Sequence, residues 1–306
     1  MLTWHVVRTL GFIFLQAPFF LAVLGYSSLW GAGSWFTRKN RALFATLSIA
    51  MWLPLLGLRV SAQGSPIFFK KSSSNTIKLF LCTHQSFSDA LVLALLLWIS
   101  RAPLGPGIAL YKKELGKIPL LGLLQRFAGN IPVERSGDVS SAKQSLENAA
   151  RSAKNGYHIS GFPEGSRRRS PSEGKIGELK KGFFHMIHNF CQNGIPVEVF
   201  PVVFVGSFRS WPLGNLAPIP GSRIAVRIGE PVLFGAEMSV EEARNTVAER
   251  LKSEIDLAAC DDGKKYSLDA AFNKGKEINF ASIFGLEMIL CTLPVLGSIL
   301  AVLFTH

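Results

Sequence analysis

Between Thr76 and Ala259, stretches with strand character alternate with stretches with helix character. The strand candidates are rich in β-branched and aromatic residues, and they read "IKLFLC" (77–82), "HISGFP" (158–163), "VEVFPVVFVG" (197–206) and "RIAVRIG" (223–229). Helix candidates lie between them, over "DALVLALLLWI", "SAKQSLENAARSAK" and "KKGFFHMIHNFC". Because strands separated by helices build parallel sheets, this order predicts an α/β domain with a largely parallel sheet flanked by helices.

The clearest single helix is "SVEEARNTVAERLKSEIDLAA", which begins after Ser239. Ser239 and Glu242 have the spacing of a capping box, in which each side chain bonds the backbone N–H of the other residue. Apolar side chains recur every three to four residues behind this start, as expected for one buried stripe on a helix. The stripe consists of Ala243, Val247, Leu251 and Ile255.

Three apolar runs flank this region. Residues 10–36 and 278–304 each form a run of about 27 residues, long enough as a helix to span a bilayer, whereas the run 42–58 has about 17 and contains Pro54. Basic residues stand before the run 10–36, between it and the run 42–58, and after the run 42–58. If both of these runs spanned the bilayer, the basic cluster between them and the domain that follows could not both obey the positive-inside rule in the simplest way. We therefore expect an N-terminal two-helix membrane hairpin and a C-terminal transmembrane helix. The alternative is that one of the two N-terminal runs spans the bilayer and the other packs on the protein.

These patterns predict four segments: membrane-embedded helices over 1–60, an α/β domain over 61–259, a charged linker over 260–277 and a membrane helix over 278–306. Glu287, the one charge of the last run, is interpreted either as a buried partner for the hairpin or as a residue near a membrane interface.

The composition favours a lipid partner over a nucleic acid. The formal charge is +12, so the surface attracts anions, while hydrophobic residues make up 48% of the chain and charged residues only 18%. We expect a membrane protein whose α/β domain faces the cytoplasm, with membrane lipid as a partner and no nucleic acid. The four cysteines have no close pair, which argues against a zinc knuckle and a disulfide framework.

The stretch "THQSFSD" contains a histidine and an aspartate five residues apart, His84 and Asp89. The structural interpretation is a capping box between Ser86 and Asp89 at the start of a helix. The functional interpretation places His84 on the strand-to-helix turn, where the Asp89 carboxylate reaches one imidazole nitrogen and leaves the other as a general base. The spacing alone does not decide between them.

Three further stretches follow in order: "GNIPVERSG", "GFPEGSRRRS" and "VFPVVFVG". Together with "THQSFSD" they resemble the four blocks of the glycerophospholipid acyltransferase family, the enzymes similar to bacterial 1-acyl-sn-glycerol-3-phosphate acyltransferase. The connector "YKKELGKIPLLG" and the late strand "VRIGEPV" are also similar. The family usually has Asn where this chain has Thr83, and Thr where it has Ser166.

This resemblance implies roles for individual residues. His84 and Asp89 correspond to the catalytic pair. Arg135 and Arg167 match arginines that hold the acceptor phosphate, for which guanidinium offers a planar fork of donors. The acceptor glycerol site is expected to be shaped by Glu164, Gly165 and Ser166.

The predicted reaction is transfer of a fatty acyl group from acyl-CoA or acyl-carrier protein to the free hydroxyl of a lysophospholipid, first of all lysophosphatidic acid. One alternative is an acyltransferase that acts on another lyso-lipid, such as a lyso-aminolipid, or in phospholipid remodelling. A second alternative, ranked lower, is a non-enzymatic basic membrane protein. The chain has no G-x-S-x-G, H-E-x-x-H or Walker A motif, so we expect direct transfer without a metal or nucleotide cofactor.

Overall fold

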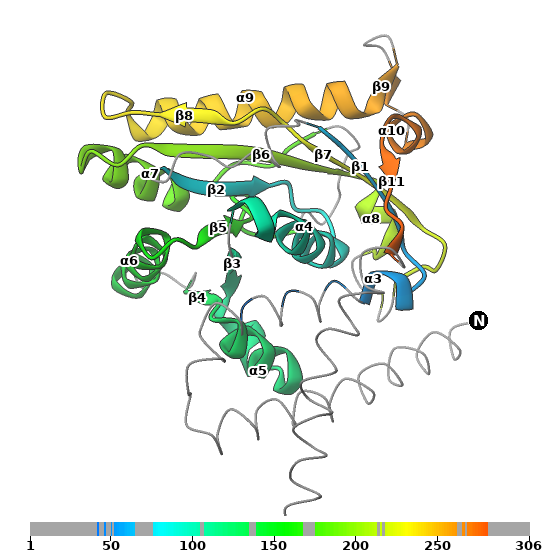
Figure 1. Cartoon of the computed structure of the whole chain (residues 1–306), viewed down its shortest axis with the longest axis horizontal. Helices are drawn as coiled ribbons and strands as arrows, with labels where there is room; N and C mark the ends of the chain where they lie inside the picture. Colours follow the sequence, from blue (N-terminus) through cyan, green and yellow to red (C-terminus); the bar gives the residue numbers. More distant parts are fainter. Residues whose placement is uncertain are drawn as a thin grey trace, which may run out of the picture.

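The computed structural model describes residues 42, 46, 50, 52–64, 76–104, 107–134, 139–167, 175–212, 215, 218–261, 265–266 and 268–280. Nine of the described strands form one sheet in the order β11-β1-β7-β6-β2-β5-β3-β4, with β8 paired to β6 (Figure 1). These strands are β1 (Arg59–Gly64), β2 (Ile77–Cys82), β3 (Gly107–Lys112), β4 (Ile131–Val133), β5 (His158–Gly161), β6 (Val197–Val205), β7 (Arg223–Ile228), β8 (Val232–Phe234) and β11 (Lys276–Glu277).

The sheet is mixed rather than uniformly parallel. The five described pairings β1–β7, β2–β5, β2–β6, β3–β4 and β3–β5 are parallel. The described pairings of β6 with β7, β6 with β8 and β1 with β11 are antiparallel. The sheet around β2 is thus parallel, as predicted, and the antiparallel pairs lie on the other side of β6.

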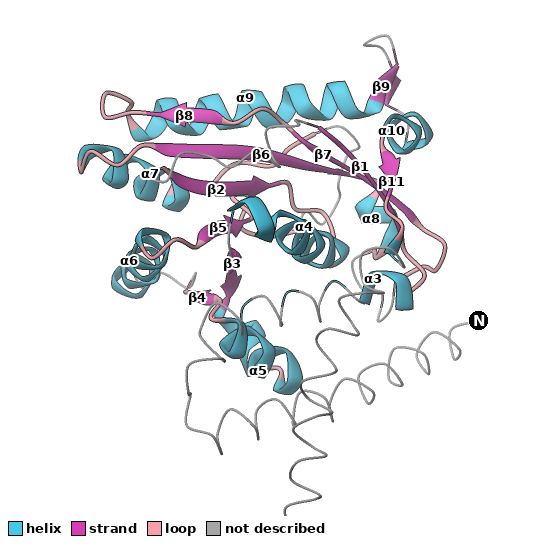
Figure 2. Cartoon of the chain, viewed as in Figure 1, coloured by secondary structure: helices cyan, strands magenta, loops and turns pink. Residues whose placement is uncertain are grey.

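Helices cover both faces of the sheet (Figure 2). The described helices are α3 (Trp52–Leu55), α4 (Ser88–Leu104), the 3-10 helix η2 (Lys113–Lys117), α5 (Pro119–Ala128), α6 (Val139–Lys154), α7 (Gly182–Gln192), α8 (Ser207–Ser210), α9 (Val240–Ala259) and α10 (Leu268–Lys274). A separate pair of short strands, β9 (Cys260–Asp261) and β10 (Lys265–Tyr266), follows α9.

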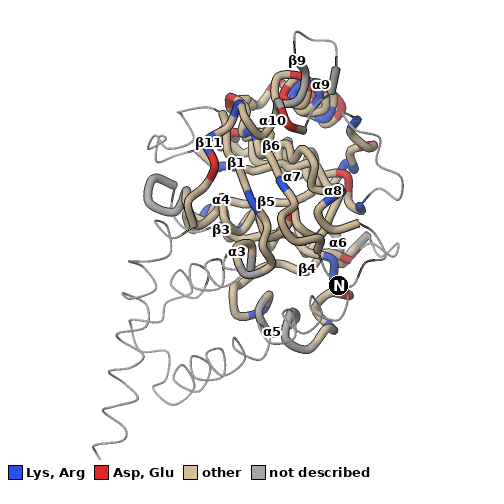
Figure 3. Tube along the Cα trace, turned by 90° about the vertical axis from the view of Figure 1, so that its right-hand side faces the viewer, with Lys and Arg blue, Asp and Glu red and all other residues tan. Residues whose placement is uncertain are grey.

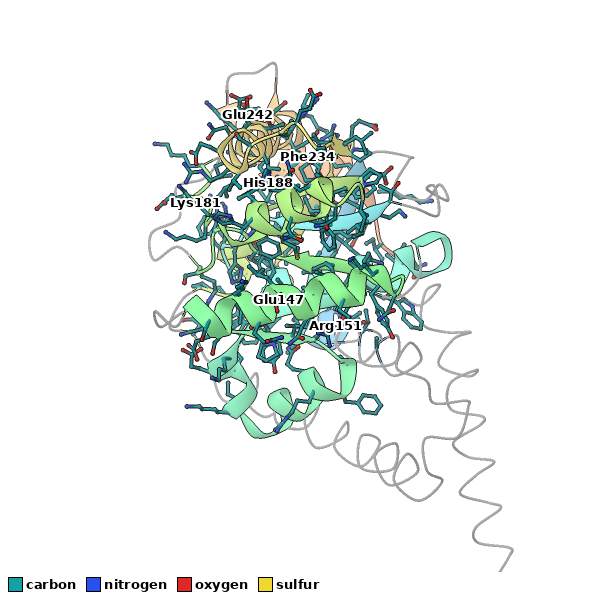
Figure 4. The ribbon with its side chains drawn as sticks, turned by 90° about the vertical axis from the view of Figure 1, so that its left-hand side faces the viewer. Glu147, Arg151, Lys181, His188, Phe234 and Glu242 are labelled. Carbon is teal, nitrogen blue, oxygen red and sulfur yellow. The ribbon has the colours of Figure 1, made fainter. Side chains whose placement is uncertain are left out.

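The alternation of side chains along β2 divides the core into two clusters. Leu79 and Leu81 point to the face covered by α6, α7 and α9, whereas Phe80 and Cys82 point to the face covered by α3 and α4. This is expected because successive side chains of a strand point to opposite faces. Figure 4 looks onto the first of these faces, where α6 carries Glu147 and Arg151, and α7 lies between α6 and α9.

The predicted helix after Ser239 is confirmed as α9. The backbone N–H of Ser239 donates to the Glu242 carboxylate at 2.8 Å, and the N–H of Glu242 donates to Oγ of Ser239 at 3.2 Å. The predicted apolar stripe is buried against the sheet. The same helix carries both acidic and basic positions, and Figure 3 shows it nearly end-on.

No described helix combines the length and the apolar character needed to cross a membrane. This contradicts the predicted fold class with an N-terminal membrane hairpin and a C-terminal transmembrane helix. Within the run 42–58, α3 ends after Leu55, and Gly57 has a φ of 71°, which ends a helix at little cost. Leu53 and Leu56 pack in the protein core instead.

The runs 10–36 and 281–304, and Glu287 with them, lie outside the described residues. The predicted membrane localisation stays a prediction. The predicted linker 260–277 includes α10 and β11, and β11 pairs with β1 at the sheet edge. The predicted segment boundaries stay a prediction as well.

Candidate active site

The turn between β2 and α4 lies at the carboxyl end of β2, near the centre of the sheet (Figure 1). Thr83 opens this turn and ties it to β6, because its N–H donates to the Val202 carbonyl at 3.0 Å and its Oγ1 accepts the Phe204 N–H at 3.1 Å. The Thr83 hydroxyl therefore holds the turn on the sheet. Ligands of open α/β sheets bind in this position, outside the carboxyl ends of strands.

The structure brings the histidine and the aspartate together. Nδ1 of His84 lies 3.2 Å from Oδ2 of Asp89, which is fully buried, whereas the His84 side chain is 17% exposed. The same Oδ2 accepts the N–H groups of Gln85 at 2.6 Å and Ser86 at 2.7 Å. The carboxylate half of the predicted capping box is thus present together with the imidazole contact, while Oγ of Ser86 accepts the N–H of Ser88 at 3.2 Å.

A hydrogen bond from Nδ1 to Asp89 selects one protonation pattern of the imidazole. In the neutral ring the proton sits on Nδ1, and Nε2 is left with a lone pair. The buried carboxylate also stabilises the imidazolium that forms when Nε2 accepts a proton. This arrangement can serve as a general base for a hydroxyl group.

Glu164 holds the histidine backbone from the neighbouring strand. It follows β5, which is parallel to β2, so both strand ends lie at the same edge of the sheet. Its Oε1 accepts the His84 N–H at 2.9 Å, and its Oε2 accepts the Gly177 N–H at 2.7 Å. The buried carboxylate therefore connects the "THQSFSD" turn to the segment that follows "GFPEGSR".

Phe162 stacks on the catalytic histidine candidate, a contact that the sequence interpretation missed. The rings of His84 and Phe162 have centroids 4.0 Å apart and planes inclined by 18°. The available signal was the place of Phe162 immediately before "PEGSR", at the end of β5. The stack covers one face of the imidazole and fixes its plane.

Three side chains near His84 carry a thiol or a hydroxyl that could act as a nucleophile, and all three are buried. Burial, and secondarily the charge of Asp89, raises the pKa of the Cys82 thiol well above its usual value, so the thiol stays protonated. The fully buried Ser86 donates its hydroxyl to the Trp211 carbonyl at 3.1 Å, and Oγ of Ser88 lies 2.7 Å from Oγ of Ser210. The two serine hydroxyls therefore tie the turn to Trp211 and to α8.

Arg167 lies over the aromatic ring of Phe87, with Cζ 3.6 Å from the ring centroid. Burial lowers the pKa of the guanidinium, and the charge of Asp89 opposes this shift. Gly165 has a φ of 78°, in the left-handed region that favours glycine. Arg135 lies outside the described residues. The proposed substrate-binding roles of Arg135, Glu164, Gly165, Ser166 and Arg167 stay predictions.

No group of three or more His, Cys, Asp or Glu side chains within the described ranges could hold a metal ion. The prediction of a reaction without a metal stays untested. The groups that the described site offers are an imidazole, carboxylates and a guanidinium.

The comparisons with known proteins agree with the motifs. Residues 70–205 match the family model described as Acyltransferase, and this confirms the resemblance predicted from the four blocks. Proteins of Limnanthes douglasii and Limnanthes alba, both described as 1-acyl-sn-glycerol-3-phosphate acyltransferase, are 30% identical over 176 residues. The match covers 56% of this chain and 54% of each relative, so the chain spans about half the length of these relatives.

The fold also has a solved counterpart. The crystal structure of the 1-acyl-sn-glycerophosphate acyltransferase from Thermotoga maritima is similar, with a TM-score of 0.58 and 23% sequence identity. The similarity covers 83% of this chain and 96% of the other. At this identity it supports the α/β fold alone.

Proposed function

We propose that this chain, whose motifs resemble those of the glycerophospholipid acyltransferases, transfers a fatty acyl group from a thioester to the free hydroxyl of a lysophospholipid. The observation that carries the proposal is the contact between Nδ1 of His84 and the buried carboxylate of Asp89. The names of the relatives support lysophosphatidic acid as the first acceptor to test, with phosphatidic acid as the product.

The reaction needs one group that first accepts a proton as a base and then donates it as an acid. Nε2 of His84 takes the proton of the acceptor hydroxyl while that oxygen attacks the thioester carbonyl carbon and forms the new C–O bond. The tetrahedral intermediate then breaks its C–S bond, and the thiolate that leaves receives a proton from the imidazolium. Asp89 stabilises the imidazolium between these two steps.

The acceptor has to be held while its hydroxyl points at His84. Arg167 is a suitable group, because its guanidinium is near the dyad and guanidinium pairs well with phosphate oxygens. The donor belongs to the acyl-CoA or acyl-carrier protein class. Both carriers are anionic, and the net charge of +12 on this chain favours the binding of anions.

The test is a substrate panel. The purified full chain is incubated with lysophosphatidic acid, lysophosphatidylcholine, a lyso-aminolipid or monoacylglycerol, each with acyl-CoA or acyl-carrier protein, and the products are identified by mass spectrometry. We expect the fastest product formation with lysophosphatidic acid. A chain that acylates none of these acceptors would refute the proposed function, and a preference for the lyso-aminolipid would refute the proposed acceptor.

A further inference from the structure

The Arg167 guanidinium lies against the aromatic ring of Phe87. Its Cζ atom lies 3.6 Å from the ring centroid of Phe87, well within the distance of a cation–π contact. Within the described part of the chain, no carboxylate forms an ion pair with Arg167. A cation–π contact orients a guanidinium without neutralising its charge, and it leaves the N–H donors in the guanidinium plane for another acceptor.

Phe87 connects the turn that holds the dyad with Arg167. It lies in the turn between His84 and Asp89, and its carbonyl accepts the Ala90 N–H at 3.2 Å at the start of α4. The direction of its side chain is therefore set by the same turn that sets the distance within the dyad.

Phe87 is 39% exposed and is one of the exposed large hydrophobic residues of the described chain. It also contacts the ring of Trp211, with centroids 5.5 Å apart and planes inclined by 58°. Trp211 in turn accepts a hydrogen bond from Ser86 through its carbonyl. The ring is thus supported by Trp211 and at the same time carries Arg167.

We propose that Phe87 is a positioning residue, which presents the Arg167 guanidinium to the phosphate of the acceptor at a fixed distance from His84. This inference rests on the proposed function. It follows that Phe87 acts on acceptor binding through Arg167, whereas it leaves the proton transfer at His84 unchanged.

The test compares Phe87→Leu, which removes the ring but keeps apolar volume, with Phe87→Tyr, which keeps the ring. With a short-chain lysophosphatidic acid below its micelle concentration, we expect Phe87→Leu to raise the acceptor KM about 3- to 10-fold, with kcat within about 2-fold of wild type. Phe87→Tyr is expected to behave like wild type. An unchanged KM in Phe87→Leu, or a loss of kcat alone, would overturn the proposal.

A double-variant cycle tests whether Phe87 acts through Arg167. In an Arg167→Gln background, Phe87→Leu should add no further increase in KM, because the guanidinium that it positions is already gone. The same increase in both backgrounds would overturn the proposal. Monoacylglycerol, which has no phosphate, should be bound equally well by wild type and Phe87→Leu.

Calorimetric binding of the same short-chain lysophosphatidic acid separates this inference from the proposed function. If the wild type transfers no acyl group but binds this ligand more tightly than Phe87→Leu, the proposed function fails and the role of Phe87 stands. Equal affinities, or no binding to the wild type, would overturn the role of Phe87 whatever the activity.

Discussion

A single carboxylate oxygen organises the turn that contains His84. Oδ2 of Asp89 accepts two backbone N–H groups as well as the imidazole contact, so its position does not depend on the histidine. Glu164 holds the His84 backbone in the same way from the neighbouring strand. Replacement of the imidazole should therefore remove a chemical group while the surrounding turn keeps its shape.

The stack on His84 leads to the first prediction. Phe162→Leu should lower kcat about 3- to 10-fold, because a loss of about 0.5–1.5 kcal/mol of ring contact lets the imidazole leave its reactive orientation. Phe162→Tyr keeps the ring and should retain the rate. Steady-state kinetics on both variants gives the answer, and equal rates for Phe162→Leu and wild type would show that the stack has no role in positioning.

At the scale of elements, the junction of β2 with α4 depends on the Thr83 hydroxyl. Thr83→Val keeps the shape of the side chain but leaves the Phe204 N–H without its acceptor in a buried site. We expect a loss of about 1–3 kcal/mol in the free energy of unfolding. Urea unfolding measures the loss, with Thr83→Ser as the control that keeps the hydroxyl. A Thr83→Val protein as stable as wild type would contradict this account of the turn.

The capping box of α9 predicts a dependence of stability on pH. The hydrogen bonds from Ser239 lower the pKa of Glu242 below its usual value of 4.5. Because the folded pKa is the lower one, the stabilisation is present at pH 7 and is lost as the pH falls from the unfolded pKa through the folded one. The difference in melting temperature between wild type and Glu242→Ala should therefore shrink from pH 6 to pH 4. A constant difference would rule out a charge-dependent cap.

At the scale of the whole molecule, the two core clusters on either side of the sheet set the stability. Phe200 is buried beneath α4 and stacks on Phe80, with ring centroids 5.0 Å apart. Phe200→Ala should cost about 3–5 kcal/mol because it leaves a cavity. Leu233→Ala, at a position that is 65% exposed, should change the stability by less than about 0.5 kcal/mol. Chemical unfolding of both variants distinguishes them, and similar losses would contradict the two-cluster description.

The sequence predicted the parts of the fold and site that depend on neighbours in the chain. The strand "IKLFLC", the capping box at Ser239 and the approach of Asp89 to His84 all follow from short-range patterns. The antiparallel pairing of β7 with β6 and the strand β1 did not, because pairing direction depends on distant partners and the boundary predicted at residue 60 falls within β1. The contacts of Phe162 with His84 and of Phe87 with Arg167 were missed for the same reason.

The central claim is that the His84–Asp89 pair carries out acyl transfer. The most direct measurement is the initial rate of phosphatidic acid formation from lysophosphatidic acid by His84→Ala, with folding checked by thermal melting. His188→Ala is the matched control, because His188 lies on α7 and its Nδ1 contacts the Met238 carbonyl at 3.0 Å. We expect His84→Ala to lose at least about 100-fold in rate and His188→Ala to keep the wild-type rate. A folded His84→Ala protein with the wild-type rate would contradict the account.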